Sequence, residues 1–220
     1  MPQVNTSTKR GAGRPALISR ASIGEAALAE LEGISSTKVA KRLGVAQSSL
    51  YRHITDRADL IRLAVDYALD SHEWPPPHDD WRQYLTEYAI SFWKLLEKHP
   101  GLSDALRMLQ PTSQRVIDVL SKVAIDLLSS GFTAEEANMA VDMLSHVTIN
   151  AMISEQVFNS PGRRGTTVRQ EARDAWLTQD QRLAEHTRQT LEQSMFLNLQ
   201  KRVDLVLDGL EMKLLRRAQQ

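Results

Sequence analysis

A short run of polar and aromatic residues at positions 47–53 is the part of the sequence best suited to contact another molecule. Its hydrogen-bonding members are Gln47, Ser48, Ser49, Tyr51, Arg52 and His53. The amide of Gln47 can make paired hydrogen bonds to adenine, and the guanidinium of Arg52 can make them to guanine. The serine hydroxyls are too short to discriminate bases strongly and suit water-mediated or phosphate contacts. These residue types favour double-stranded DNA as the partner.

The residues around this run have the pattern of a helix-turn-helix motif, in which Gly44 provides the tight turn between two short helices. Leu43 and Leu50 are the main apolar anchors on either side of that turn. The expected elements are a helix at 20–32, a helix capped by Ser35 or Ser36, a helix at about 46–53 and a helix from Asp56 through Leu69. Together they predict an N-terminal DNA-binding domain at 19–72.

Charge is distributed unevenly along a chain whose net charge is zero. Residues 1–67 hold ten Lys or Arg and six Asp or Glu, a net charge of +4. Residues 68–220 hold 17 Lys or Arg and 21 Asp or Glu, a net charge of −4. Residues 1–18 are polar and basic, which predicts a flexible arm. Arg14, between Gly13 and Pro15, has the form of a minor-groove insert. The alternative is a disordered tail that adds only salt-dependent affinity.

Composition argues against several other classes of protein. The absence of cysteine excludes disulfides, thiolate nucleophiles and cysteine-ligated zinc. No stretch is apolar for long enough to span a bilayer, and the first residues are polar, so we expect a cytoplasmic protein. The chain has neither a His-Glu-x-x-His segment nor a glycine-rich phosphate loop, so an enzyme is not expected. No cofactor is expected either.

Three consecutive prolines at 75–77 separate the N-terminal region from a larger helical region expected at 80–217. Its predicted helices lie at about 80–98, 102–109, 112–130, 134–157, 172–191 and 194–217, with a mobile loop at 158–168. The predicted fold class is therefore all-α. A three-helix helix-turn-helix DNA-binding domain is followed by a larger helical ligand-binding and dimerisation domain.

Two of these helices carry apolar stripes that favour a homodimer. The last helix places Phe196, Leu199, Val203, Val206, Leu210 and Leu214 on one face, and the helix at 134–157 adds Val141, Leu144, Thr148 and Ala151. Such helices can meet their two-fold mates in a four-helix interface. The alternative is that both stripes belong to the internal core of one chain. A dimer would match a palindromic DNA site.

Part of the N-terminal region resembles the DNA-binding domain of the tetracycline-repressor family of transcriptional regulators. The resemblance rests on segments 39–45 (VAKRLGV), 49–54 (SLYRHI) and 57–61 (RADLI). Ile54 takes the place of the aromatic or aliphatic residue that follows Leu-Tyr-x-His in the family, and Arg57 takes the place of a lysine, which keeps a cation for phosphate. The resemblance implies that Tyr51 and His53 contact phosphates. It also implies that Ser36, Lys38 and Arg57 clamp the DNA backbone.

The C-terminal region resembles the ligand-binding domain of the tetracycline repressors themselves, at 128–133, 145–148 and 196–211. The resemblance implies that His146 lies on a drug-contacting helix. His146 and Asn150 share a helix face with apolar residues, as in a largely apolar pocket with a few orienting hydrogen bonds. The candidate ligand-binding residues are Tyr88, Phe92, Leu106, Met108, Met143, His146, Asn150 and Trp176.

The metal chemistry of those repressors does not carry over. They bind a magnesium chelate through a histidine and a glutamate, whose positions hold Leu106 and Ser154 here. A hard cation has little to hold it without these ligands. We therefore expect no metal site and a largely apolar effector.

The sequence thus predicts a ligand-responsive, sequence-specific DNA-binding regulator, most simply a homodimeric repressor released from a palindromic operator by a small molecule. An architectural DNA-binding protein without an effector is the alternative, and an enzyme with a DNA-binding domain is a remote third.

Overall fold

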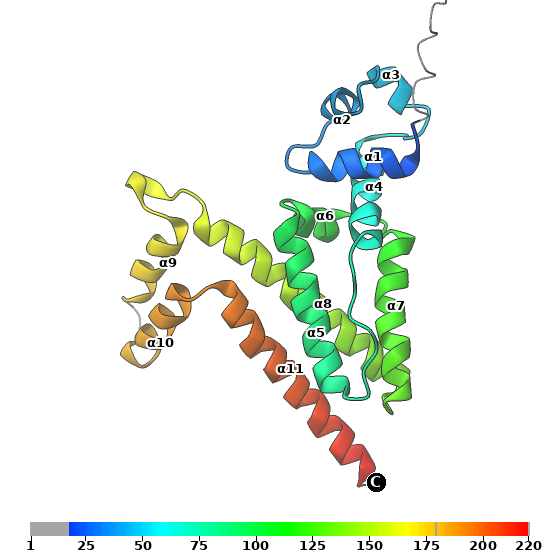
Figure 1. The fold of residues 1–220 in the computed structure, drawn as a ribbon. Helices are drawn as coiled ribbons and strands as arrows, with labels where there is room; N and C mark the ends of the chain where they lie inside the picture. Colours follow the sequence, from blue (N-terminus) through cyan, green and yellow to red (C-terminus); the bar gives the residue numbers. More distant parts are fainter. Residues whose placement is uncertain (1–17, 179, 220) are drawn as a thin grey trace, which may run out of the picture.

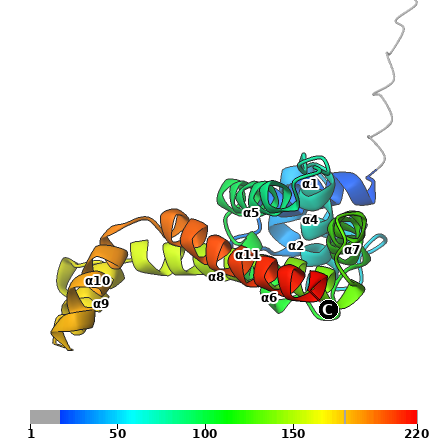
Figure 2. The same ribbon diagram turned by 90° about the horizontal axis from the view of Figure 1, so that it is seen from below.

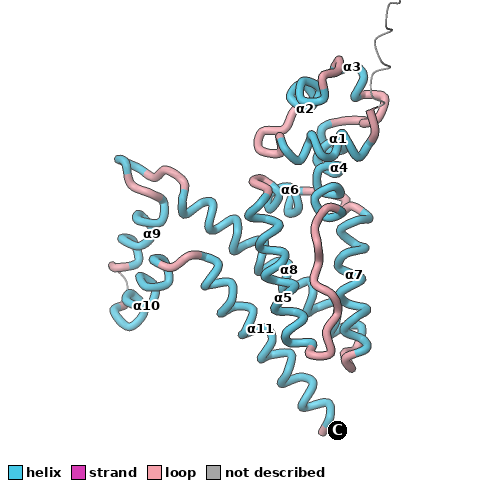
Figure 3. Tube along the Cα trace, viewed as in Figure 1, coloured by secondary structure: helices cyan, strands magenta, loops and turns pink. Residues whose placement is uncertain are grey.

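The computed structural model describes residues 18–178 and 180–219, apart from the side chain of Arg164. Within these ranges the chain forms eleven α-helices, one 3-10 turn and no β-strand (Figures 1 and 3). The predicted all-α class is confirmed. Nearly all of the predicted basic arm, including Arg14, lies outside the described residues.

Four short helices form the N-terminal part of the molecule. They are α1 (Arg20–Ala29), α2 (Ser36–Leu43), α3 (Gln47–Leu50) and α4 (Arg57–Asp70). The side chain of Ser35 accepts a hydrogen bond from the Lys38 amide, and Asp56 caps α4 in the same way. Gly44 adopts left-handed backbone at φ 69° where α2 ends. Side-chain caps therefore mark the starts of α2 and α4, and the left-handed backbone of Gly44 marks the end of α2.

The second helix of the motif is shorter than predicted, because α3 ends at Leu50 rather than His53. The amides of His53 and Ile54 both donate to the carbonyl of Leu50, at 2.8 and 3.0 Å. This shared acceptor winds 51–53 into a turn that leads directly toward α4. The polar run at 47–53 is therefore divided between a one-turn helix and the turn that follows it.

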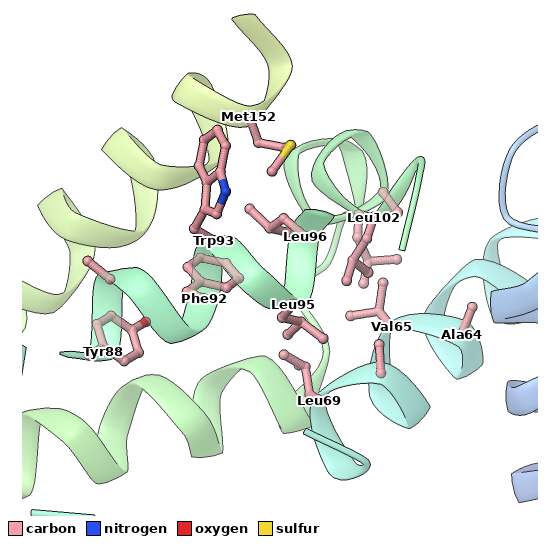
Figure 4. Close-up of a cluster of buried hydrophobic side chains, with 14 of the residues drawn as sticks. Ala64, Val65, Leu69, Tyr88, Phe92, Trp93, Leu95, Leu96, Leu102 and Met152 are labelled. Atoms are coloured by element: carbon pink, nitrogen blue, oxygen red, sulfur yellow. The ribbon is translucent and has the colours of Figure 1, made fainter. Parts of the chain in front are cut away.

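Five helices build the larger part of the molecule: α5 (Trp81–Lys98), α6 (Leu102–Met108), α7 (Gln114–Ser129), α8 (Ala134–Asn159) and α11 (Met195–Ala218). One continuous apolar core joins them to the N-terminal helices. Figure 4 shows Val65 and Leu69 of α4 beside Leu95 of α5. Helix α4 is therefore part of both ends of the molecule.

The stripes predicted to form a dimer are largely the internal core of this chain. Helices α8 and α11 pack against each other. Leu144, Thr148, Leu199 and Val203 are all buried within the single chain. An amphipathic stripe identifies an apolar face but not the chain that covers it. The alternative of internal core is correct for these residues.

The prediction of one helix at 172–191 is wrong. The chain forms two helices there, α9 (Val168–Trp176) and α10 (Gln181–Glu192), which project to one side of the molecule (Figures 1 and 2). Thr167 and Asp180 cap their N-termini through side-chain hydrogen bonds. The predicted loop at 158–168 is also shorter, because α8 continues to Asn159 and 163–165 form a 3-10 turn.

Close approach of α1 and α4 depends on Gly24. A Cβ atom at this position would lie 2.7 Å from the carbonyl oxygen of Leu63. We expect Gly24→Ala to lower the free energy of unfolding by about 1–3 kcal/mol, because backbone must shift to admit the methyl group. Urea denaturation measures this change.

The control is Ser121→Ala at an exposed position on α7. That variant should change the free energy of unfolding by no more than about 0.5 kcal/mol. Equal effects of the two substitutions would contradict the packing argument.

Glu155 joins the base of α9 to α8 and α11. Its carboxylate accepts hydrogen bonds from the Met195 amide at 2.8 Å, the Arg169 guanidinium at 3.1 Å and the Asn159 amide at 2.9 Å. Partial burial alone raises the pKa of Glu155, but these hydrogen bonds and the charge of Arg169 outweigh it. The pKa therefore lies below its ordinary value.

Because the pKa of Glu155 is depressed in the folded state, its ionised carboxylate stabilises the fold at pH values above the ordinary pKa of 4.5. That stabilisation is lost as the pH falls through the pKa of Glu155 in the folded state. We expect Glu155→Gln to lower Tm at pH 7, and the difference from the parent chain to shrink on acidification below pH 4.5. Thermal melts followed by circular dichroism test this. The exposed Glu97→Gln serves as control, and a difference independent of pH would refute the assignment.

Candidate nucleic-acid interface and ligand-binding residues

The surface formed by the start of α2 and by 47–52 brings together three of the predicted DNA-contacting side chains. The Gln47 side-chain amide donates to Ser36 Oγ at 2.6 Å, and Ser36 Oγ lies 3.2 Å from the Tyr51 hydroxyl. Tyr51 is 52% exposed, so it does not serve as core packing. A hydrogen-bonded row of polar side chains therefore faces solvent.

The other predicted contacts surround this row. Lys38, Ser48 and Arg52 are exposed, while Ser49 and His53 are half-buried. Lys38 and Arg52 make no ion pair with any residue that the structure describes. Their charges remain available to an anionic partner. Arg57 is also exposed, and its Nε donates to the carbonyl of Ile34 at 3.1 Å.

Sequence reasoning missed a polar group that positions this surface from behind. Arg20 donates to the carbonyl of His53 at 2.6 Å and to the carboxylate of Asp59 at 3.2 Å. Asp59 is buried and also accepts a hydrogen bond from the Thr55 amide at 3.2 Å. The pair ties α1 to the turn after α3. The available sequence signal was an Asp between the apolar residues Ala58 and Leu60 in the first turn of α4.

Two of the predicted ligand-binding residues lie in an aromatic cluster inside the larger part of the molecule. Trp74 stacks on Tyr88 with ring centroids 5.6 Å apart, and Phe92 lies 5.9 Å from Trp74. The Tyr88 hydroxyl is 2.8 Å from Ser145 Oγ. Burial raises the pKa of Tyr88 to about 12, so this hydroxyl is neutral at pH 7. Figure 4 shows Tyr88 and Phe92 side by side on α5.

The remaining ligand candidates lie elsewhere. Met143, His146 and Asn150 are exposed on the outer face of α8, and His146 is paired with Asp142. Met108 is 71% exposed at the end of α6, Leu106 is half-buried beside it, and Trp176 is exposed at the end of α9. The structure does not bring the eight residues into one cavity.

Two cavities lie near these side chains, and the lining of the smaller one includes none of the eight candidates. One of about 110 Å³ lies beside the aromatic cluster, lined by Trp74, Tyr84, Arg115 and Val119 among others. Another of about 580 Å³ lies between the N-terminal helices and α6, with Met108 in its lining. No group of three or more metal-ligating side chains occurs among the described residues. In the same part of the chain, no helix is both long and apolar enough to cross a membrane.

The fold and this surface define an all-helical protein that carries a helix-turn-helix at its N-terminal end and a larger helical body behind it. Residues 74–214 match the family model described as "Tetracyclin repressor-like, C-terminal domain". The chain therefore belongs to the tetracycline-repressor family.

Two curated relatives extend this finding. Tetracycline repressor protein class E from Escherichia coli is 31% identical over 135 residues, which cover 59% of this chain and 62% of the relative. The class A protein from transposon 1721, also from Escherichia coli, is 30% identical over 144 residues, covering 64% and 66%. The chain thus matches slightly less than two thirds of each relative. Both relatives are named as repressor proteins.

A solved structure matches the overall fold. The family protein ActR from Streptomyces coelicolor, in complex with actinorhodin, superposes with a TM-score of 0.74 at 18% identity. The superposition covers 89% of this chain and 96% of that one. At this identity the likeness concerns the fold alone.

Proposed function

We propose that this chain is a ligand-responsive, sequence-specific DNA-binding repressor that acts as a homodimer on a palindromic operator. Residues 19–72 would be the reading head and 80–217 the ligand-binding and dimerisation body. The observation that carries the proposal is the exposed row of Ser36, Gln47 and Tyr51 on a helix-turn-helix. No catalytic activity is part of the proposal.

Each DNA contact follows from the chemistry of its side chain. Gln47 and Arg52 read base edges, because an amide and a guanidinium make paired hydrogen bonds to adenine and guanine. Tyr51, His53, Ser48 and Ser49 reach phosphates or bases through water. Ser36, Lys38 and Arg57 bind the backbone, and Arg14 enters the minor groove. The Arg20–Asp59 pair holds the reading surface in place.

Dimerisation uses the outer faces of α8 and α11, opposite the stripes that form the internal core. Met139, Met143 and Val157 are exposed on α8, and Leu197, Leu205, Met212 and Leu215 are exposed on α11. Because these two helices pack side by side, their outer faces form one surface. An exposed apolar surface of this kind is typical of a contact with another protein. A second copy of the chain would produce the two-fold symmetry of a palindromic site.

The effector is a small, largely apolar molecule that binds beside the aromatic cluster of Trp74, Tyr88 and Phe92. The adjoining cavity of about 110 Å³ is too small for a drug-sized ligand, so the cluster must rearrange to admit one. Helix α4 forms part of the reading head and also packs against α6 and α7. A ligand that binds the rearranged state more tightly shifts the position of the reading head and so lowers operator affinity. The size of this effect is limited by the difference in the ligand's affinity for the two states. Leu106, Met108, Met143, His146, Asn150 and Trp176 lie away from this cluster and are not assigned to this site.

Selection of binding sites from random duplex DNA tests the proposal with the full, ligand-free chain. We expect an inverted repeat whose half-sites lie about one helical turn apart, on the order of 34–36 Å. Absence of enrichment at low salt would overturn a ligand-free repressor. Binding without sequence preference would instead favour an architectural protein. Thermal-shift screening with apolar compounds then identifies the effector, because binding to the folded state raises Tm.

A further inference from the structure

A second and larger cavity lies where the N-terminal helices meet α6. It encloses about 580 Å³, within the range of drug-sized sites. Leu31, Ile34 and Ile61 line it from the N-terminal helices, and Ala105 and Leu109 line it from the α6 side. It is separate from the aromatic cluster and from the cavity beside Trp74.

The apolar floor of this cleft is held in place by packing. Leu31, Ile34 and Leu109 are buried in the surrounding core and form apolar walls. At one edge the backbone of Glu32 approaches Gly101 so closely that a Cβ on the glycine would lie 3.4 Å from the Glu32 nitrogen. A preformed apolar cleft binds a ligand without a large cost in ordering.

The charged groups of the lining are the Arg57 guanidinium and the carboxylates of Glu32 and Asp104. Arg57 is held in position by the hydrogen bond from its Nε to the carbonyl of Ile34, at 3.1 Å. Its two terminal nitrogens make no ion pair with any described residue. Asp104, in contrast, is already paired with Arg107 at 3.2 Å. A positioned guanidinium with free donors suits an anion with two adjacent oxygens, such as a planar carboxylate or a phosphate.

We propose that this cleft binds a small aromatic or otherwise apolar carboxylic acid, with its acid group on Arg57 and its apolar part on Leu31, Ile61 and Leu109. Binding itself needs no DNA. A regulatory effect rests on the proposed function, in which Arg57 holds an operator phosphate. One guanidinium cannot serve both anions fully, so the acid then weakens operator binding.

Binding of 1-naphthaleneacetate to the full chain, compared with its uncharged amide, tests the proposal by titration calorimetry. We expect the acid to bind about tenfold more tightly than the amide, since a charge-assisted pair with Arg57 is lost in the amide. Arg57→Gln should remove that difference. Ala58→Trp, which places a large ring from an exposed lining residue into the cleft, should abolish binding of both compounds.

The control is Ser121→Trp, at an exposed position on α7 outside the cleft, which should bind both compounds as the parent chain does. Circular dichroism confirms that each variant remains helical. Failure of the acid to bind, equal affinity for acid and amide, or unchanged binding by Ala58→Trp would each overturn the proposal. None of these outcomes bears on operator binding, so the two proposals fail separately.

Discussion

Replacing Tyr51 and Arg52 together by alanine is expected to abolish specific operator binding while leaving the protein folded. Without the Arg52 guanidinium the protein loses a paired contact to a base, worth about 1–3 kcal/mol. Without the Tyr51 side chain the protein loses a contact to DNA and the hydrogen bond between the Tyr51 hydroxyl and Ser36 Oγ. Because a dimer loses these contacts in both half-sites, affinity should fall by roughly 100-fold or more. Fluorescence anisotropy with the selected operator measures the loss.

A matched pair elsewhere on the surface separates loss of contact from general damage. Leu177→Ala with Arg182→Ala removes one exposed apolar and one exposed cationic side chain near the break between α9 and α10. This control should bind DNA as the parent chain does, and both double variants should melt at similar temperatures. Full operator affinity in the Tyr51/Arg52 variant would disprove the reading surface proposed above.

The second large effect is expected at the outer face of α11. Leu205 and Met212 are 73% and 50% exposed in the single chain and would lie in the proposed dimer interface. Leu205→Glu with Met212→Glu would place four carboxylates in an apolar contact, where unpaired charge costs several kcal/mol. We expect the dimer dissociation constant to rise by about 1000-fold or more. Analytical ultracentrifugation follows the change, and affinity for a palindromic operator should fall with it.

Gln181→Glu with Gln200→Glu provides the charge-matched control, because both side chains are exposed and lie off the proposed interface. That variant should remain dimeric. A parent chain that is monomeric at operator-binding concentrations would refute the dimer. A Leu205/Met212 variant that stays dimeric would show that the subunits meet through another face.

Most helix boundaries were predictable from the sequence because they depend on local chemistry. Ser35, Asp56 and Thr133 accept hydrogen bonds from the first turns of their helices, and residues of these types just ahead of an amphipathic run are recognisable in the sequence itself. The break between α9 and α10 was missed because no glycine or proline marks 177–180. Asp180 caps α10 there, but a single Asp is also common on an exposed helix face.

The sequence of one chain did not show what covers each helix face. The apolar stripes of α8 and α11 were recognised, yet periodicity does not show whether the same chain or another chain covers them. The ligand candidates had the same difficulty. His146 and Asn150 share one helix face, but that face points outward, whereas Tyr88 and Phe92 point into the core from α5. The Ser36–Gln47–Tyr51 row was not predictable as a network, since its members come from two helices and the turn after α3.

The core shared by α4, α5 and α6 couples the unfolding of the two ends of the chain. Leu60, Val65 and Leu69 belong to the same apolar cluster as Leu95 and Leu102. Helix α4 therefore cannot unfold with the N-terminal helices without exposing the apolar core of the larger part of the molecule. Calorimetry should record a single cooperative transition rather than two separate ones. A fragment ending at residue 72 would lose part of its own hydrophobic support, and the N-terminal helices would not be stable in isolation. If the N-terminal helices were exchanged between proteins during evolution, the residues of α5 and α6 that pack against α4 would therefore have to change with them.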